Sequence, residues 1–269
     1  MSKQISPNKQ LIITAMGITS AVFTGGIFGQ IEASTGIPLY SFMFFFILPV
    51  GAFIAGVMAA SGYYLGAITF HQKPAGGVAL NMVLVAIGAY FLAHYIPYNS
   101  LVVDGVQIKD KVSFLQYLDI SIRHTTLSIK GHKTGELGST FGYIYELIQL
   151  IGFSLGGLCV FAFLLELPFC QKCSEYLKKM NTQERYTSEG EVLFENVELF
   201  AKTLDEKKYR QAIKIHADRM GVAESKGHHL RTRITIHKCK TCEINHLDFE
   251  TAHLDGGDWK NIAKSRIKL

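Results

Sequence analysis

Four of the five cysteines fall into two pairs, Cys170 with Cys173 and Cys239 with Cys242, and two residues separate the members of each pair. Two thiolates at this spacing can bind one ion together, and two such pairs supply the four sulfur ligands of a tetrahedral Zn²⁺ site. The sequence therefore predicts a structural zinc ion held by all four of these cysteines.

Other chemistry is open to the same residues. A single Cys-x-x-Cys pair is typical of thiol redox centres, which use one thiol of lowered pKa, but two pairs exceed what that chemistry needs. Iron–sulfur clusters also take four thiolates, yet the pairs lack a spacing that indicates one. Four thiolates would fill the coordination sphere of zinc and leave no position for a reactive water. We therefore assign no catalytic or cofactor-binding residue, and an enzyme is the less favoured class.

The second pair lies between two segments, 230–238 and 245–254, that are expected to form two strands joined by the cysteine turn; the first of them alternates apolar and polar residues. A cysteine pair at the tip of a hairpin, with a distant second pair, resembles a zinc ribbon. The resemblance covers only the two pairs and the hairpin, and it implies a metal module rather than a full-length family. Zinc ribbons often have glycine after the second cysteine of each pair, whereas this chain has Ser174 and Glu243 there.

The region between the pairs is expected to be largely helical. Residues 174–180 are predicted to form a helix, and apolar residues among acids and lysines predict two more at 189–201 and 204–220. The last two would make a helical hairpin inserted at about 189–221. His237 is close enough to Cys239 to replace a ligand, but a role in strand packing is favoured because four cysteines are available.

Charged residues are concentrated in the same C-terminal part: residues 168–269 hold 19 of the 27 Lys and Arg and 15 of the 22 Asp and Glu. Upstream, four apolar segments approach or exceed the ~20 residues that cross a bilayer. They are residues 11–29, 40–64, 77–98 and 143–167. The predicted fold class is thus an α-helical integral membrane protein with four transmembrane helices and a small α+β zinc-ribbon-like cytoplasmic domain.

This assignment divides the chain into a membrane domain, residues 1–167, with an extracytoplasmic loop at about 99–142, and a cytoplasmic metal-binding tail, residues 168–269. The first apolar segment is expected to be a helix rather than a cleaved signal peptide, because it is longer than a typical signal core. Lysines near the N-terminus, in the turn after the second segment and after the fourth fall on one side, which the positive-inside rule makes cytoplasmic. Both termini would then be cytoplasmic, in a plasma membrane or a bacterial inner membrane.

Several residues within the apolar segments carry further expectations. Pro49 should kink the second helix, because it removes a backbone donor. Cys159 is expected to pack as a small apolar residue. Small residues recur every four positions in the first segment, which indicates close helix packing within the bundle and leaves a homo-oligomer open. These residues are Gly17, Ala21, Gly25 and Gly29.

No charged residue lies near the middle of any apolar segment, since Glu146 and Glu166 are near the ends of theirs. Carriers and ion pathways usually place ionisable groups there, so the bundle is interpreted as an anchor or signalling device. The expected function is partner binding or signalling through a cytoplasmic zinc domain, with a protein partner beside the lipid bilayer. The alternatives are a membrane thiol oxidoreductase, a transporter subunit, or a membrane-tethered binder of nucleic acid or acidic lipid. Acidic residues interleave with the basic residues of the tail, which favours an ordinary solvated surface over the last of these.

Overall fold

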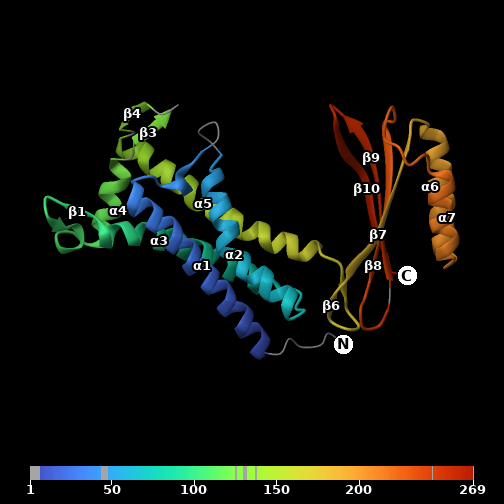
Figure 1. Cartoon of the computed structure of the whole chain (residues 1–269), viewed down its shortest axis with the longest axis horizontal. Helices are drawn as coiled ribbons and strands as arrows, with labels where there is room; N and C mark the ends of the chain where they lie inside the picture. The colour runs from blue at the N-terminus through green and yellow to red at the C-terminus, as the bar shows by residue number, and fades with distance from the viewer. Residues whose placement is uncertain are drawn as a thin grey trace. The chain divides into compact units, whose positions relative to one another are not determined.

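The computed structural model describes residues 7–43, 48–124, 126–129, 132–136, 138–243 and 245–268. The chain divides into two compact units, Met1–Glu166 and Leu167–Leu269 (Figure 1). The first unit is built mainly of helices, and the second combines a sheet with two helices.

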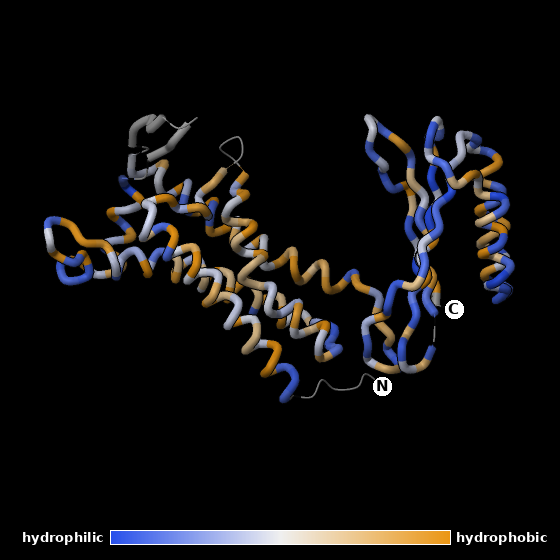
Figure 2. The backbone as a smooth tube through the Cα atoms, viewed as in Figure 1, coloured by the Kyte–Doolittle hydropathy of each residue, from blue (hydrophilic) through white to orange (hydrophobic). Residues whose placement is uncertain are grey.

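Four long helices dominate the first unit: α1 (Pro7–Thr35), α2 (Val50–Thr69), α3 (Gly76–Ser100) and α5 (Ser139–Glu166). All four are long and apolar enough to cross a membrane, and Figure 2 shows hydrophobic residues along each. Short elements occupy the connections: η1 (Leu39–Ser41), β1 (Val102–Val103), β2 (Val106–Gln107), η2 (Ile108–Asp110), α4 (Phe114–Arg123), β3 (Thr126–Ile129) and β4 (His132–Glu136).

Small residues let these helices approach closely. Gly25 of α1 faces α3 so tightly that an added Cβ would lie 2.6 Å from the carbonyl oxygen of Ala89. Gly17 meets the ring of Tyr63 on α2 in the same way. The predicted packing face of α1 is therefore confirmed, and it is occupied by other helices of the same chain.

Large apolar side chains point outward from the same bundle. Phe23, Leu84 and Phe163 are exposed, whereas the fully buried positions of α2 and α3 are mostly alanines such as Ala55 and Ala86. A helical bundle in water buries its largest apolar groups because of the hydrophobic effect. Between helices in lipid this driving force is absent, and small residues lie at the helix contacts. Cys159 is exposed among these outward-facing residues, so the expectation that it packs inside the protein is wrong.

The second helix also differs from the prediction. α2 begins at Val50, directly after Pro49, and runs to Thr69 instead of spanning residues 40–64. Proline is well suited to a helix start, because the first backbone N–H groups of a helix have no intrahelical acceptor. Pro49 consequently lies before the helix and does not kink it, and Tyr40 belongs to the separate turn η1.

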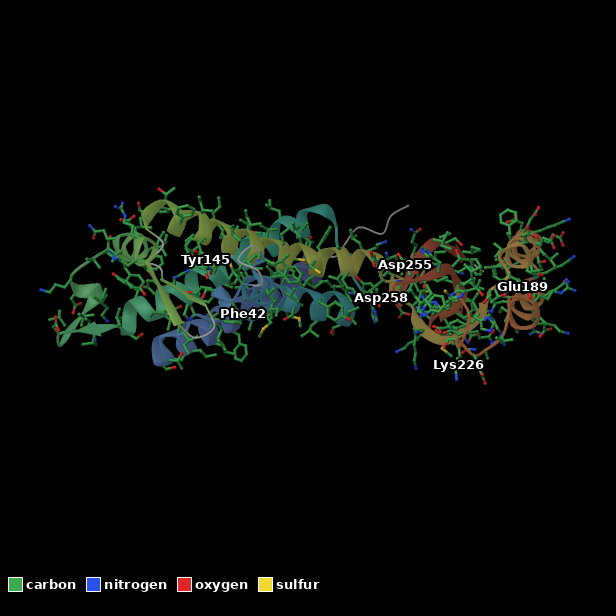
Figure 3. All side chains as sticks on the ribbon, turned by 90° about the horizontal axis from the view of Figure 1, so that it is seen from above. Phe42, Tyr145, Glu189, Lys226, Asp255 and Asp258 are labelled. Carbon is green, nitrogen blue, oxygen red and sulfur yellow. The ribbon has the colours of Figure 1, made fainter. Side chains whose placement is uncertain are left out.

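The second unit is built on a four-stranded antiparallel sheet in the order β10-β9-β8-β7. Its strands are β7 (Lys178–Thr187), β8 (Leu230–Lys238), β9 (Asn245–Asp255) and β10 (Asp258–Lys268). A short hairpin of β5 (Phe169–Cys170) and β6 (Glu175–Tyr176) precedes them. A tight turn joins the last two strands, with Asp255 and Asp258 on either side of it (Figure 3).

Two helices, α6 (Gly190–Asp205) and α7 (Tyr209–Arg219), connect β7 to β8 and lie together on one side of the sheet (Figures 1 and 3). Their apolar faces form one core with the central strands, in which Phe200 packs on Phe249 at 4.8 Å between ring centroids. The helices lie where the sequence predicts them, and Gly221 follows α7 with a φ of 113° that favours glycine.

Strand predictions in this unit are confirmed for β8 and β9. The predicted helix at 174–180 is wrong, because this segment enters β6 and then β7. β7 pairs with β8 along its whole length, from Lys178 opposite Lys238 to Thr187 opposite Leu230. Pairing with a strand some fifty residues away overrides the local helical preference of its lysines.

Candidate functional site

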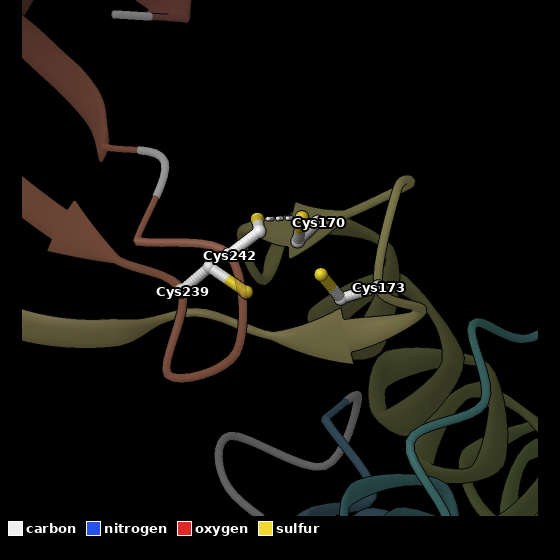
Figure 4. Close-up of side chains that lie close together, drawn as sticks. All are labelled: Cys170, Cys173, Cys239 and Cys242. Atoms are coloured by element: carbon white, nitrogen blue, oxygen red, sulfur yellow. Dashed lines mark hydrogen bonds between the residues drawn. The ribbon is translucent and has the colours of Figure 1, made fainter.

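Two turns bring the cysteines together. Cys170 ends β5 and Cys173 lies in the turn to β6, while Cys239 and Cys242 lie in the turn between β8 and β9. All four sulfur atoms are within 4.8 Å of one another, and those of Cys170 and Cys242 are 3.5 Å apart (Figure 4). A disulfide would need about 2.05 Å, so these are free thiols. Tetrahedral ligation with metal–sulfur bonds of about 2.3 Å places neighbouring sulfurs about 3.8 Å apart, which is close to this arrangement.

The backbone directly after each pair takes a left-handed conformation, which glycine adopts most readily. Ser174 has a φ of 54° and Glu243 a φ of 58°, both in the left-handed region. This reverses the chain directly after the second cysteine of each pair. In the second turn, the backbone N–H groups of Thr241 and Cys242 donate to the sulfur of Cys239. The two positions where glycine was missing thus adopt the glycine-like conformation with other side chains.

Side chains around the sulfurs connect the two turns. The carboxylate of Glu175 accepts a hydrogen bond from the hydroxyl of Thr241 at 2.9 Å and lies 3.7 Å from the sulfur of Cys239. Cys170 and Cys239 are buried beside Leu177, and the other two cysteines are half-buried. One side of the cluster therefore faces the protein and the other is accessible to an entering ion.

The thiols raise one another's pKa. The hydrogen bond with Cys242, together with burial and the neighbouring sulfurs, raises the pKa of Cys173 to about 12. Burial raises the pKa of Cys239 as well. Four thiolates cannot gather at these distances without a compensating positive charge, and a divalent cation supplies it. The arrangement can therefore hold a soft or borderline metal ion.

The histidines of this unit do not join the cluster. His237 packs within the sheet with its Nε2 atom 3.3 Å from the carboxylate of Asp248, which confirms the favoured strand-packing role. Asp248 also accepts hydrogen bonds from Arg266 at 2.6 and 2.8 Å. Burial alone would raise the pKa of Asp248, but the hydrogen bonds and charges of Arg266 and His237 outweigh it and hold that pKa below its usual range.

Basic residues of the sheet are paired within the unit. Arg233 contacts the carboxylates of Glu184 and Glu250, and Lys264 also contacts Glu250. Arg231 lies over the ring of Trp259, at 5.1 Å from its centroid. This pattern agrees with a solvated, internally compensated surface.

A second cluster of ionisable groups lies in the helical unit, where none was predicted from the sequence. His94 of α3 is buried, with its Nε2 atom 3.5 Å from the nearly buried carboxylate of Glu146 on α5. Tyr40 donates to Glu32 at 2.6 Å and lies 3.3 Å from Nδ1 of His94. Glu146 is near the end of its apolar segment, but its side chain points into the bundle.

A signal for this orientation does exist in the sequence. Gly142, Glu146, Gln149 and Phe153 recur at spacings of three and four, so they share one face of α5. Gly142 and Phe153 contact other elements of the bundle closely, which marks that face as the inner one. The face of the helix on which a glutamate lies therefore indicates its burial better than its distance from the helix end does.

The descriptions of both clusters rest on geometry alone, since no protein-family model, no curated protein and no solved structure shows a significant match to this chain.

Proposed function

We propose that this chain is a multi-pass membrane protein whose second unit is a structural zinc domain of the zinc-ribbon type that binds a protein partner at the cytoplasmic face. The observation that carries the proposal is the convergence of four thiols from two turns, each followed by a residue of left-handed backbone. Four sulfur ligands in a tetrahedral arrangement select zinc or iron, and isolated pairs of this kind are typical of zinc.

The metal in this proposal stabilises the protein and does no chemistry. Four thiolates close the coordination sphere, so no position is left for a water or a substrate. The ion would fasten the β5–β6 hairpin to the turn between β8 and β9, since one pair comes from each. Cys170 follows Glu166, the last residue of α5, by four positions. The zinc site would thus fix the chain where it leaves the last long helix.

The membrane assignment rests on the four apolar helices and on their exposed large side chains. The cytoplasmic side is proposed for the second unit because thiols stay reduced in the cytoplasm. The lysines near the N-terminus, after the second apolar segment and after the fourth also favour this side. Both termini would share that side.

Partner binding is supported by a hollow on the second unit, beside α6. It has a volume of about 350 Å³ and is lined by apolar residues that include Val192, Met220 and Val222 and by polar ones that include Glu189, Asp218, Arg219 and His228. Val192 and Val222 are both about half exposed. An apolar side chain of a partner would fill this hollow and cover them.

Zinc content of the purified full-length protein tests the proposal. The expected result is one zinc per chain by elemental analysis, loss of zinc in Cys239→Ser with Cys242→Ser, and full retention in Cys159→Ser, which removes the cysteine outside the cluster. The four clustered thiols should resist alkylation until a chelator is added. A metal-free protein whose clustered thiols instead cycle between dithiol and disulfide in redox buffers would establish the thiol oxidoreductase and refute a structural zinc site.

Crosslinking in cells tests the partner surface. A photoreactive residue in place of Val222 should give a discrete crosslinked product, whereas one in place of Ile262, a slightly more exposed residue of β10, should not. Equal products from both positions would rule out the hollow as the partner site.

A further inference from the structure

Five side chains from four elements form a connected ionisable network inside the helical unit. Glu32 comes from α1, Tyr40 from η1, Tyr90 and His94 from α3, and Glu146 from α5. The Tyr40 hydroxyl donates to Glu32 at 2.6 Å and lies 3.3 Å from Nδ1 of His94, whose Nε2 is 3.5 Å from Glu146. Tyr90 hydrogen-bonds to Glu146 and packs edge-on against His94 at 4.7 Å between ring centroids. The network runs without a break from one glutamate to the other.

Two buried atoms of the network have no hydrogen-bond partner among the described residues. They are Oε2 of Glu146 and Nε2 of His94, which at 3.5 Å from Oε1 of Glu146 is at ion-pair distance but too far for a conventional hydrogen bond. Buried polar atoms without partners are uncommon in native proteins and call for a specific explanation. Both atoms belong to groups that can accept a proton.

The composition of the helices shows what can neutralise the two glutamates. Residues 10–72, 74–108 and 138–171 contain no lysine or arginine, so the four long helices offer no basic side chain beyond Lys9 at the start of α1. His94 is the one group within the network that can carry positive charge. With His94 neutral and both carboxylates ionised, the network would hold two negative charges in an apolar bundle, which is strongly unfavourable. The remaining way to lower that charge is to bind a cation.

We propose that this network is a proton-binding site, in which one proton is held between Glu146 and His94. Two arrangements contain the same number of protons: a neutral Glu146 that donates to Nε2 of His94, and an imidazolium that donates from Nε2 to an ionised Glu146. In both, Nδ1–H of His94 donates to the Tyr40 oxygen, and the Tyr40 hydroxyl donates to Glu32. The hydrogen bonds to Tyr40 therefore fit either position of the shared proton.

The packing favours a proton over a larger cation. Tyr40 and Tyr90 pack on His94 with ring centroids 5.2 and 4.7 Å away, and Phe153 packs on both tyrosines at 6.2 and 5.4 Å; all three are buried. Among the described residues, the group of metal-ligating side chains that could hold an ion is the cysteine cluster, and this network is not part of it. A proton needs only the lone pairs that Glu146 and His94 already present.

The surrounding elements contribute few other titratable groups. The described residues that face the network, beyond its own members, are Tyr117 of α4, near Glu32, and Tyr145 of α5, next to Glu146. α2 faces it with alanines and glycines, and its tyrosines Tyr63 and Tyr64 lie toward the other end of the helix. Glu32 is half-buried three residues before the end of α1, so it gives the proton a route to the surface.

Infrared difference spectroscopy of the full-length protein in lipid bilayers tests the proposal, because a protonated carboxyl group has a carbonyl band separate from that of a carboxylate. Between about pH 4 and pH 9, the wild type should bind one proton per chain, which appears as a carboxyl band where Glu146 holds it and as an imidazolium band where His94 holds it. The band should be lost in Glu146→Gln. Its titration midpoint should move in His94→Gln and in Tyr40→Phe, which removes a single hydroxyl group and preserves packing.

Two matched variants provide the controls. Glu166→Gln changes a glutamate at the exposed end of the same helix, and His71→Gln changes an exposed histidine between α2 and α3. Both should leave the band and its midpoint unchanged. The proposal is overturned if the wild type has neither a titrating carboxyl band nor a titrating imidazolium band that Glu146→Gln removes, or if Glu166→Gln removes the band. It is also overturned if sodium ions displace the proton and shift the midpoint, which would make the ligand a metal cation.

Discussion

Glycine at the two left-handed positions of the cysteine turns should strengthen metal binding. A non-glycine residue in this region costs about 1 to 2 kcal/mol, and Ser174 and Glu243 both occupy it in the arrangement that gathers the sulfurs. Glycine removes that strain but has more conformational freedom to lose in the metal-free chain, which costs about 0.4 to 1 kcal/mol. The difference between these two terms lies between about 0 and 1.6 kcal/mol per site, and a low value of about 0.5 kcal/mol per site gives about 1 kcal/mol for both.

A gain of about 1 kcal/mol corresponds to roughly five-fold tighter zinc binding in the double variant Ser174→Gly with Glu243→Gly. The measurement is competition for zinc between the full-length protein and a coloured chelator of known affinity. Ser174→Val should act in the opposite direction, because a branched side chain is poorly tolerated at positive φ. The surface ion pair of Glu243 with Lys238 is exposed, so its loss contributes little.

Glu206→Gly is the matched control, because Glu206 is an exposed glutamate that ends α6 with a φ of −74°. It should leave zinc affinity unchanged. If the glycine double variant binds zinc more weakly than the wild type, or if the valine variant binds it more tightly, the turns do not need left-handed backbone to hold the ion and the reasoning from φ fails.

Three further predictions concern the stability of each unit. Burial, with the charge of a nearby arginine, lowers the pKa of His216 to about 4. Between about pH 6.5 and pH 4 the unfolded histidine is protonated and the folded one is not, so the free energy of unfolding falls by up to about 3 kcal/mol as the pH is lowered through this range. Urea midpoints followed by the single tryptophan should show this slope, and His216→Leu should remove it. Asp248→Asn should destabilise the sheet by about 2 kcal/mol above pH 4, because it weakens the charged hydrogen bonds from Arg266. The difference in the free energy of unfolding between this variant and the wild type should become smaller as acid protonates Asp248 in the wild type. Gly25→Ala should destabilise the helical unit by about 1 to 3 kcal/mol in a thermal assay, because its Cβ would strike the backbone of α3, whereas Gly26→Ala, with nothing within 4 Å of the new atom, should be neutral or stabilising.

Much of the architecture follows from local patterns in the sequence. Helices of the first unit are marked by apolar length, β8 by alternation, and the helical hairpin by its apolar spacing. Each cysteine pair lies at a hairpin turn, and hairpin turns are set by nearby residues. The two turns meet, however, because β7 pairs with the distant strand β8.

The errors share a different cause. Residues 174–180 pair with β8, and that partner cannot be identified from the segment itself. Glu146 was judged by its distance along a helix, whereas its burial depends on which face of the helix meets the neighbouring helices. Pro49 was placed inside a helix because the apolar stretch continued through it, although proline marks where α2 begins. Each miss concerns a contact or boundary decided by three-dimensional packing.

The position of the cysteine cluster also defines what metal loss can do. The main core of the second unit, between α6, α7 and residues such as Ile234 and Phe249, is separate from the small core around Cys170, Leu177 and Cys239. The cysteine turn follows the last residue of β8, whereas Phe249 and Ile234 pair four positions further into the sheet. Chelation should therefore release the β5–β6 hairpin and the ends of β8 and β9 while the sheet and its helices stay folded. The released hairpin is the segment that follows α5. Metal content and protection of this hairpin from proteolysis therefore discriminate the proposed role better than global stability does.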